Sequence, residues 1–588
     1  MTDIFEKNMA ILARVNPGLY ERLTWPVDTS IAKLENKALF YKVHQQFYHL
    51  TPENSAFTHA VGELLEEPSI LIFGCENGYF LQSMFEAKYK GKIFVWERDP
   101  WLLRLLLSHH DFTLKMVTGK VRFFLGSALF DLIPQVQFMP IVAAHFFKSV
   151  YQNEFNILQY GLKKRLVYIC TGTLFIDDLA SAFQEQGFSV YVWDAIRLSL
   201  EESLHLFDHK KPDLVFSINY IQGITEFCAQ YNVKYICWEI DPYIDYPQTA
   251  DGIPDNSFIF SFRQKNLPQF LNTGFKNTQY LPLAANTENR RPLNLPETDI
   301  QKYAADISFV GSSMVTEAAK QKQLFIDLFA QNMWGKPEDA RKIALYLFDV
   351  IIKVQSFDWD HYLIEQLCEN HFHEFLGQDP EFQQKLYKWT MLLGETAASQ
   401  RRLNIVERLI PYNIQVWGDN GWLKLQDKKL YFRGSAGHQL ELTKIYNASF
   451  INLDINRFYQ QDIVTMRVFD VLACGSFIIA EHSDALAELF KIGVEVESYA
   501  SFGELEDKIK YYLKHREITG KIALKGCKAV LQKHTIAERL RYMLKESAVK
   551  SGKISGIQVV DTGTKTPQRE RKGKLLTNII NNSPETNT

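Results

Sequence analysis

The 588-residue chain is poor in three features, each of which would have indicated a class of protein. Only seven cysteines are present, scattered from Cys75 to Cys527 with the spacing of neither a metal site nor a disulfide ladder. The 65 Lys and Arg residues against 68 Asp and Glu leave a formal net charge of −3, which gives no reason to expect a nucleic-acid partner. No apolar run approaches the roughly 20 residues that a membrane-spanning helix needs, so we expect no integral membrane segment.

Signals for export and for metal binding are also missing. The first residues, MTDIFEKNMA, contain no basic segment followed by an apolar one, so we expect no secretory leader. With scattered, reduced cysteines, this indicates a cytoplasmic protein. The 15 histidines are dispersed, and His371 and His373 would point to different faces of a helix. We therefore expect no metal site.

What is present is a repeated pattern of short apolar runs and helical spacings, which indicates βα units and largely parallel sheets. Residues 1–160 show one βαβα unit after a helical lead-in of about 60 residues. Residues 161–300 begin with RLVYICTG and carry five or six short strands with helices between them. Residues 301–548 begin their sheet with DISFVGSS and include a helical stretch without strands at about 318–409.

These blocks predict an α/β fold class with two facing Rossmann-like domains, 161–300 and 301–548, the latter with a helical insertion at about 318–409. An N-terminal Rossmann-like α/β domain, 1–160, precedes them. The polar, Pro-rich stretch NTENRRPLNLPETDIQKYAA is interpreted as a linker. Residues 549–588 are polar and are expected to form a disordered tail.

The stretch from Asp462 to Ala480 carries the most informative polar pattern. Asp462 and Asp470 stand eight residues apart and flank a predicted helix start, with Arg467 in the first turns. The unpaired N–H groups of a helix start attract phosphate, and Arg467 would add a charge-assisted contact. A carboxylate accepts hydrogen bonds from vicinal hydroxyls. The pattern therefore suits a nucleotide-sugar, with its ribose on Asp470 and its sugar near Asp462.

A purely structural interpretation of the same residues is equally open on spacing alone. Asp462 would then cap the helix, and Asp470 would pair with Arg467 three residues earlier. Neither role would involve a ligand.

The segment RVFDVLACGSFIIAE resembles the donor site of GT-B glycosyltransferases, in which two carboxylates precede a small-residue-plus-Gly turn and a short apolar strand. Four segments resemble, in order, the CgeB-like (spore-maturation-protein-like) branch of group 1 glycosyltransferases. They are FSINYIQGITEFCAQYNVKYICWEID, TQYLPLAAN, DISFVGSS, and ASFINLDIN followed by MRVFDVLACGSFII, together spanning about Arg165 to Leu544. The resemblance implies a GT-B fold and a retaining, metal-independent glycosyltransferase that needs no cofactor. Its donor would be a UDP- or other nucleotide-diphosphate-sugar, and its acceptor a protein, a glycan or a cell-surface precursor.

By this resemblance Asp470 is the ribose-binding carboxylate and Asp462 the catalytic carboxylate near the sugar. Both are Asp where the broader motif has Glu, so each is one methylene shorter and the identity of the donor stays open. Gly475 belongs to the turn that lets the next strand pass close to the ligand. His482 lies in the loop that lines the donor pocket in the resembled fold.

Two further groups of residues follow predicted strands. Gly311, Ser312 and Ser313 could offer backbone N–H groups to phosphate, and a plain strand-to-helix turn explains them equally well. Asp241 closes a buried strand directly before Pro242, which favours an extended backbone. It could orient or deprotonate an acceptor hydroxyl, and an ordinary turn residue is the alternative.

Two other functions also fit the sequence. A glycine turn at Gly74–Gly78 follows one strand and Glu97 ends the next, as in Rossmann-type methyltransferases that hold S-adenosylmethionine. The chain would then be a methyltransferase with a glycan-binding GT-B portion, and Glu97→Ala would abolish binding of S-adenosylmethionine. The third possibility is a non-catalytic nucleotide-sugar-binding scaffold, in which the donor-site Asp pair could be replaced without effect.

Overall fold

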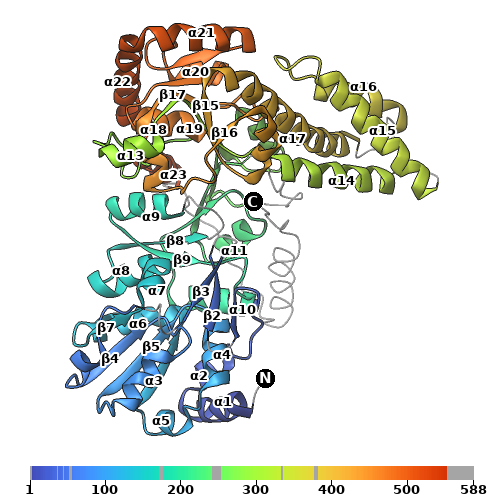
Figure 1. The fold of residues 1–588 in the computed structure, drawn as a ribbon. Helices are drawn as coiled ribbons and strands as arrows, with labels where there is room; N and C mark the ends of the chain where they lie inside the picture. Colours follow the sequence, from blue (N-terminus) through green and yellow to red (C-terminus); the bar gives the residue numbers. More distant parts are fainter. Residues whose placement is uncertain are drawn as a thin grey trace. The chain divides into compact units, whose positions relative to one another are not determined.

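Two compact units make up the chain. The computed structural model describes residues 3–35, 38–43, 46–51, 56–170, 176–241, 253–332, 336–376 and 382–551. Unit 1 comprises Met1–Ser261, Lys265–Tyr280 and Leu540–Thr588, and unit 2 comprises Phe262–Gln264 and Leu281–Arg539. Figure 1 shows the elements of both units.

Unit 1 begins with two helices and a small antiparallel sheet. The helices are α1 (Asp3–Val15) and α2 (Pro17–Arg22), and the strands follow in the order β1 (Ala32–Glu35), β2 (Ala38–Val43) and β3 (Gln46–Leu50). The expectation of a helical lead-in of about 60 residues is therefore wrong in its second half. The strand β1 alternates apolar and polar side chains over only four residues, and β2 and β3 show no regular alternation, so the three give little strand signal.

A four-stranded parallel sheet follows, in the order β6-β5-β4-β7. Its strands are β4 (Ser69–Phe73), β5 (Lys92–Glu97), β6 (Val121–Leu125) and β7 (Ile141–Ala143). Its helices are α3 (Tyr79–Glu86), α4 (Pro100–His109), α5 (Thr113–Val117), α6 (Leu129–Val136), α7 (His145–Val150) and α8 (Gln152–Tyr160).

The second sheet of unit 1 has six parallel strands in the order β13-β12-β11-β10-β8-β9. The strands are β8 (Arg165–Cys170), β9 (Phe188–Trp193), β10 (Leu214–Ile218), β11 (Lys234–Glu239), β12 (Ser257–Ser261) and β13 (Asn277–Tyr280). The helices are α9 (Ile176–Glu185), α10 (Leu200–His209), α11 (Ile224–Gln230), α12 (Leu267–Asn272) and the later part of α23 (Ile536–Ser551). One continuous apolar core runs through both parallel sheets of this unit.

Unit 2 is built on another six-stranded parallel sheet, in the order β16-β15-β14-β17-β18-β19. The strands are β14 (Ala305–Val310), β15 (Ile414–Trp417), β16 (Tyr431–Phe432), β17 (Ser449–Leu453), β18 (Ile478–Glu481) and β19 (Glu497–Tyr499). The helices around it are α13 (Glu297–Tyr303), α18 (Leu440–Ala448), α19 (Met466–Ala473), α20 (Asp484–Leu489), α21 (Phe502–Lys514) and α22 (Arg516–Lys533). The predicted α/β class with two Rossmann-like domains is confirmed.

A helical subdomain separates β14 from β15 in the sequence. It consists of α14 (Val315–Asn332), α15 (Pro337–Gln355), α16 (Ile364–Leu376) and α17 (Phe382–Leu409), which lie together in Figure 1. Aromatic rings fill its core: the ring centroids of Phe329 and Phe372 lie 5.2 Å and 5.0 Å from that of Trp389. The described part of this stretch contains no strand, as the helical spacing predicts.

The predicted linker is more ordered than its composition suggests. It contains helix α13, and its Arg290 is buried at 3% exposure. The boundaries 1–160, 161–300, 301–548 and 549–588 stay predictions. Helix α23 continues to Ser551, and the remainder of the predicted tail lies outside the described residues.

Two glycines of α22 provide a matched test of how this helix packs on α19. A Cβ at Gly526 would lie 2.2 Å from the carbonyl oxygen of Glu495 and 2.6 Å from Cδ2 of Leu472, whereas nothing lies within 4 Å of one at Gly520. We expect Gly526→Ala to lower the free energy of unfolding by about 2 kcal/mol, because backbone cannot move aside cheaply. Gly520→Ala should raise it by up to about 1 kcal/mol. Urea denaturation measures both, and equal effects would contradict this packing.

Candidate functional site

Helix α19 begins where the sequence predicts. Thr465 is its N-cap residue, with extended backbone angles, and no side chain caps the helix by a hydrogen bond. Asp462 lies three residues earlier in a turn. The structural alternative in which Asp462 caps the helix is therefore wrong.

The end of α19 depends on Gly475. Its φ of +68° is in the left-handed region, and its N–H donates to the carbonyl of Leu472 at 2.9 Å. The N–H of Ser476 donates to the carbonyl of Val471 at 3.2 Å, which completes a Schellman cap. A Cβ here would also stand 3.3 Å from Cγ of Pro292. The backbone thus explains this glycine without a ligand, and its contact with a donor stays a prediction.

Asp470 pairs with a buried arginine from the predicted linker. Arg290 donates from Nε to Oδ2 of Asp470 at 3.0 Å, and the two residues are 3% and 5% exposed. Its terminal nitrogens donate to the carbonyls of His438 at 2.6 Å and Gln439 at 3.1 Å. Burial lowers the pKa of Arg290, and the charge and hydrogen bond of Asp470 more than offset this and raise it. The alternative pairing of Asp470 with Arg467 is not observed.

Asp462 pairs with Arg263, which belongs to unit 2 although it follows β12 in the sequence. Nε of Arg263 donates to both carboxylate oxygens, at 3.0 Å and 2.8 Å, and Nη2 donates to Oδ1 at 2.8 Å. Nη2 also donates to the carbonyl of Tyr459 at 2.9 Å. The side chain of Asp462 keeps 27% exposure against 6% for Arg263. Asp462 is thus oriented by an arginine and still accessible.

Arg467 is held against the carboxyl end of β14. It forms an ion pair with Asp454, which is 1% exposed, and donates from Nε to the carbonyl of Val310 at 2.9 Å. Its guanidinium carbon lies 4.9 Å from the ring centroid of Phe309. Asp454 also accepts the hydroxyl of the N-cap Thr465 at 2.8 Å. The strand end and the helix start are therefore tied to one carboxylate.

A second buried arginine adds positive charge beside this pair. Arg402 on α17 is 7% exposed and donates to the carbonyls of Ser312 at 2.9 Å and Ile455 at 3.0 Å. Its Nε has no hydrogen-bond partner in the described part of the chain. Burial, followed by Arg467 and Arg457, lowers the pKa of Arg402 to about 9. It remains protonated at neutral pH, and no carboxylate among the described residues forms an ion pair with it.

We call Arg402, Arg457 and Arg467 the arginine cluster. Two carboxylates are paired with its members: Asp454 with Arg467, and Glu395 with Arg457 at 3.3 Å. Among the described residues, three cations thus face two anions. The excess positive charge, partly out of water, is suited to an anionic ligand.

The turn after β14 is stabilised from within the protein. The carboxylate of Asp419 accepts the hydroxyl of Ser312 at 2.6 Å and the N–H of Ser313 at 2.7 Å. The N–H of Gly311 donates to the carbonyl of Trp417 at 2.9 Å. These contacts are those of the strand-to-helix turn, and a phosphate contact at Gly311, Ser312 or Ser313 stays a prediction.

His482 is exposed at the end of β18. Its N–H donates to the carbonyl of Tyr499 at 2.8 Å, and Nδ1 lies 3.3 Å from Oγ of Ser498. The preceding Glu481 is buried and pairs with Arg401 at 2.7 Å. Glu481 is therefore structural, and the part of His482 in a donor site is untested.

Asp241 lies in unit 1, where Asn219 positions it. The amide of Asn219 donates to Oδ2 of Asp241 at 2.7 Å, and its Oδ1 accepts the N–H groups of Ile240 and Asp241 at 2.9 Å and 3.2 Å. Asn219 has a φ of +59°, in the left-handed region that Asn tolerates. The carboxylate is exposed, and a role on an acceptor stays a prediction.

Glu97, the candidate ribose ligand for S-adenosylmethionine, is fully buried. Its carboxylate accepts the N–H groups of Cys75 at 2.8 Å and Asp99 at 3.0 Å, and the hydroxyl of Tyr151 at 2.8 Å. These bonds hold the glycine turn in place. Because the carboxylate of Glu97 is engaged in these bonds, they do not favour the methyltransferase alternative, in which Glu97 would bind a ribose diol.

Within the described residues, no group of three or more His, Cys, Asp and Glu side chains is arranged to hold a metal ion.

Asp358 and Asp360 have the spacing of an Asp-x-Asp pair. Asp358 accepts the N–H groups of Asp360 and His361 at 2.9 Å and 3.0 Å, and Asp360 accepts that of Phe502 at 3.1 Å. Both carboxylates serve turns. None of the described helices combines the length and apolar character needed to cross a membrane.

The sequence alone pointed to the carboxylates and missed their partners. Arg290 occurs in a stretch with the composition of a solvated linker. Arg402 lies in a long helix and is one of many basic residues, so nothing in the sequence distinguishes it. Arg263 follows a strand of the other unit. Asp454 could have been predicted as a site residue from the sequence, since it directly follows a buried strand in ASFINLDIN.

Residues 400–545 match the family described as "Glycosyl transferase-like". The matched segment contains Arg402, Asp454, Asp462, Arg467 and Asp470. It thus supports a glycosyltransferase relationship for the part of unit 2 that carries the site. No curated protein matches the chain.

Several solved structures are similar to the chain at low identity. HepE from Anabaena in complex with UDP-glucose is 9% identical with a TM-score of 0.38, covering 66% of this chain and 100% of that one. Sucrose-phosphate synthase from Thermosynechococcus elongatus is 10% identical with a TM-score of 0.39, at the same coverage. A glycosyltransferase from Rickettsia africae is 10% identical with a TM-score of 0.37, covering 66% and 99%. All are distant similarities.

Loss of Arg290 should be costly because it leaves the buried carboxylate of Asp470 without its cation. We expect Arg290→Gln to lower the free energy of unfolding by about 3–5 kcal/mol. Arg516→Gln is the matched control, since Arg516 pairs with Asp306 at the same 2.9–3.0 Å separation but with 59% and 43% exposure. It should cost less than about 1 kcal/mol. Equal losses in urea unfolding would contradict the burial of the Arg290 pair.

Asp419 should make the fold sensitive to acid. Burial raises its pKa, but the hydrogen bonds from Ser312, Ser313 and Gly421 outweigh burial and lower it below the ordinary 3.8. Because the folded-state pKa is the lower one, the carboxylate stabilises the fold above about pH 4, and this is lost as the pH falls through the folded-state value. Asp419→Asn should therefore be less stable at pH 7 by about 1–2 kcal/mol, with the difference shrinking towards pH 3.

The control is Asp507→Asn, because the side chain of Asp507 is 83% exposed. This variant should follow the wild type across the whole range. Thermal unfolding of the three proteins from pH 7 to pH 3 gives the comparison. A pH-independent effect of Asp419→Asn would show that its charged form contributes nothing.

Proposed function

We propose that the protein is a GT-B glycosyltransferase that moves a sugar from a nucleotide diphosphate donor to a protein, glycan or cell-surface acceptor. In finer detail we propose a cytoplasmic, CgeB-like, retaining and metal-independent enzyme, whose donor is a UDP-sugar or another nucleotide-diphosphate-sugar. The carboxylates at Asp462 and Asp470, and the resemblance of their segment, support this.

The observation that carries the proposal is the excess positive charge of the arginine cluster. It lies where β14 ends and within reach of the start of α19, since Arg467 belongs to the first turn of that helix and bonds to Val310. The carboxyl end of a parallel strand and the N-terminus of a helix are where diphosphates bind in α/β folds. All three arginines of the cluster fall in the segment 400–545 that matches the glycosyltransferase-like family.

The proposed chemistry needs little more than charge stabilisation. When the bond between the sugar carbon and the diphosphate oxygen breaks, negative charge develops on the leaving diphosphate. Fixed cations in a partly desolvated place stabilise that charge without reorganising. Arg402 and Arg467 are fixed by backbone carbonyls, and Arg402 has an Nε whose hydrogen bond is unused in the described structure. This would let the leaving group depart without a metal.

The two carboxylates would play different parts. Asp462 keeps 27% exposure while Arg263 fixes its orientation, which suits a group that meets the sugar. Asp470 is 5% exposed and bound to Arg290, so we propose that it presents one edge to a ribose and draws its rigidity from the arginine. Gly475, His482 and the turn Gly311–Ser313 are assigned to the donor site by resemblance. Asp241 is the proposed base for the acceptor hydroxyl.

The test is a panel of nucleotide-sugars scored by thermal shift and by donor hydrolysis. Arg457→Gln is the variant of choice, because the side chain of Arg457 is 35% exposed. Since the change leaves the buried carboxylate of Glu395 without its cation, urea unfolding first establishes that the variant is folded. We expect one donor to stabilise the wild type, with binding weakened about tenfold or more in the variant by loss of a charge-assisted contact. Arg516→Gln serves as the surface control and should bind like the wild type.

Two results would contradict the proposal at different levels. If the donor stabilises Arg457→Gln as well as the wild type, the arginine cluster does not hold the diphosphate. Asp470→Asn tests the ribose contact in the same way. If no donor in a broad panel binds, the glycosyltransferase assignment itself is wrong.

A further inference from the structure

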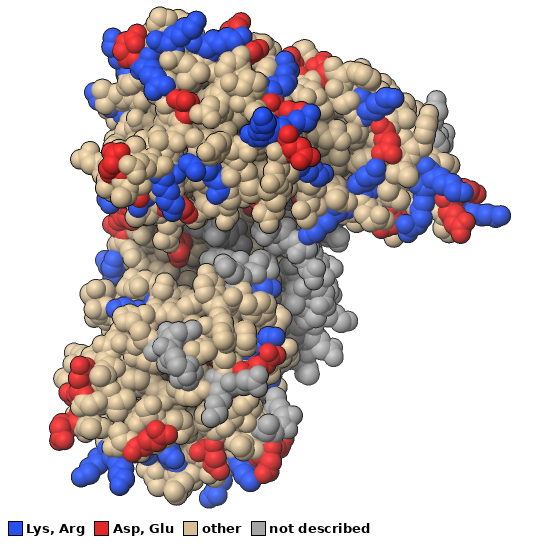
Figure 2. Space-filling view, in the orientation of Figure 1, with Lys and Arg blue, Asp and Glu red and all other residues tan. Residues whose placement is uncertain are grey.

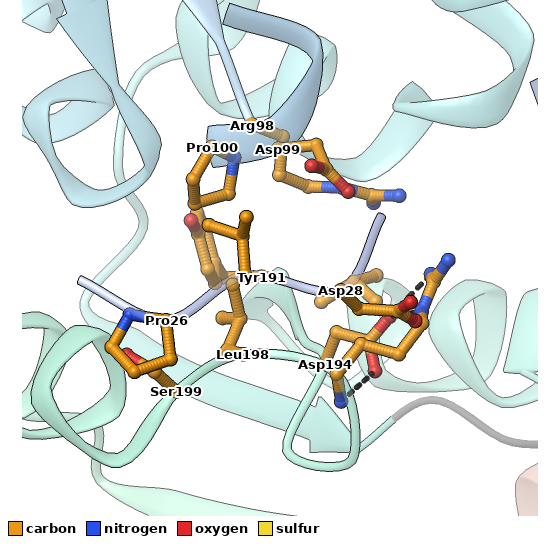
Figure 3. Close-up of a pocket in the computed structure, with 12 residues that line it drawn as sticks. Pro26, Asp28, Arg98, Asp99, Pro100, Tyr191, Asp194, Leu198 and Ser199 are labelled. Atoms are coloured by element: carbon orange, nitrogen blue, oxygen red, sulfur yellow. Dashed lines mark hydrogen bonds and ion pairs between the residues drawn. The ribbon is translucent and has the colours of Figure 1, made fainter. Parts of the chain in front are cut away.

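A cleft in unit 1 is unrelated to the residues assigned so far. The cleft is open to solvent and is lined by polar and apolar side chains from three parts of the unit. The polar ones are Asp28, Arg98, Asp99, Tyr191, Asp194, Arg197 and Ser199, and Figure 3 labels all of them except Arg197. Prolines, valines and Leu198 supply the apolar surface between them.

Two parallel sheets contribute their carboxyl edges to this cleft. Arg98 and Asp99 directly follow β5, and Asp194 directly follows β9. Asp99 is the N-cap residue of α4, and Ser199, which also lines the cleft, is the N-cap residue of α10. The carboxyl ends of parallel strands are where α/β proteins bind small ligands. Here two such edges from different sheets meet.

The hydroxyl of Tyr191 is the observation that points to a ligand. Tyr191 is 3% exposed, and its hydroxyl has no hydrogen-bond partner among the described residues. Its ring packs against Phe130 and Tyr168, at centroid distances of 5.5 Å and 5.3 Å. In Figure 3 Tyr191 lies between Pro100 and Leu198 in the middle of the lining. Because Tyr191 lines the cleft, this hydroxyl is available to donate to or accept from a ligand there.

The charges of the cleft select the ligand class. Arg197 forms an ion pair with Asp194, and Arg98 has a single hydrogen bond in the described residues, to Glu154 at 3.4 Å. Burial, opposed by Arg197, raises the pKa of Asp99 to about 6. Two guanidinium groups thus face three lining carboxylates, so the cleft has no excess positive charge for a phosphate. The cleft instead offers hydrogen-bond donors from its arginines and acceptors from its carboxylates.

Hydroxyl groups match this arrangement because each one donates and accepts. A ring hydroxyl can accept from Arg98 or Tyr191 and donate to Asp99, whose Oδ1 already accepts the N–H of Trp101 at 2.7 Å. The apolar face of a sugar ring can rest on the proline and leucine surface. We propose that this cleft binds an uncharged sugar residue, with the hydroxyl of Tyr191 and the guanidinium of Arg98 as its donors.

The proposal is independent of the donor chemistry in unit 2, so each can fail without the other. Full-length protein is titrated with methyl glycosides of glucose, galactose, mannose and N-acetylglucosamine, and binding is followed by saturation-transfer NMR. Glucose 6-phosphate and inorganic phosphate are the charged comparators. We expect at least one neutral glycoside to bind and inorganic phosphate not to compete with it.

Tyr191→Phe removes only the hydroxyl, which makes no internal hydrogen bond in the described structure. We expect unchanged thermal stability and about tenfold weaker glycoside binding. Tyr168→Phe is the matched control: Tyr168 is the register partner of Tyr191 on β8, and its hydroxyl donates to the carbonyl of Lys210. This variant should lose stability and keep the affinity.

Three outcomes would overturn the proposal. They are the absence of binding across the neutral panel, equal affinity of Tyr191→Phe and the wild type, and a preference for the phosphorylated sugar. Circular dichroism of both variants shows that they are folded.

Discussion

Buried pairing of arginine with carboxylate is the interaction on which the site in unit 2 depends. The pairs Arg290–Asp470, Arg263–Asp462 and Arg467–Asp454 fix the stretch from the end of β17 to the middle of α19. Ion pairs of this kind gain little over an apolar core, but removing one member leaves a charge that is expensive to bury. The pairs therefore fix the positions of these side chains more than they stabilise the fold. A binding site needs side chains in fixed positions.

These pairs also explain why the site keeps a positive character. Each of the three carboxylates is matched by an arginine, so Arg402 is an additional cation, and its hydrogen bonds within the described residues go to backbone carbonyls. Burial and the neighbouring Arg467 and Arg457 lower its pKa. A cation in this position, in a segment that matches a glycosyltransferase-like family, supports the proposal that an anionic ligand binds here.

Local pattern was enough to predict the elements, but not the long-range partners. The strands β8, β10 and β14 and the helix start near Met466 follow from apolar runs, capping and a glycine stop. The resemblance adds that Asp462 and Asp470 belong to one site. The antiparallel strands β1–β3 were not predicted, because they are short and partly polar.

The partners of the carboxylates could not be predicted for a physical reason. Arg290 and Arg263 lie 180 and 199 residues from the carboxylates they bind. No local spacing encodes such a contact, and an arginine in a polar stretch has the same sequence signature whether it is solvated or buried. The cleft near Tyr191 could not be predicted either. It joins the ends of β5 and β9, which belong to different sheets, and no local spacing encodes that contact.

The last helix has a consequence for how the protein is made. Unit 1 contains the first 261 residues, yet residues from Leu540 onward also belong to it. Within that unit the hydroxyl of Tyr542 donates to Gln279 at 2.8 Å, and Lys234 donates to the carbonyl of Ser547 at 3.1 Å. A ribosome releases these last residues only after all of unit 2 has emerged. Throughout synthesis, the six-stranded sheet of β8 to β13 must therefore remain without its α23 contacts, and a chain cut short before α23 would lack them as well.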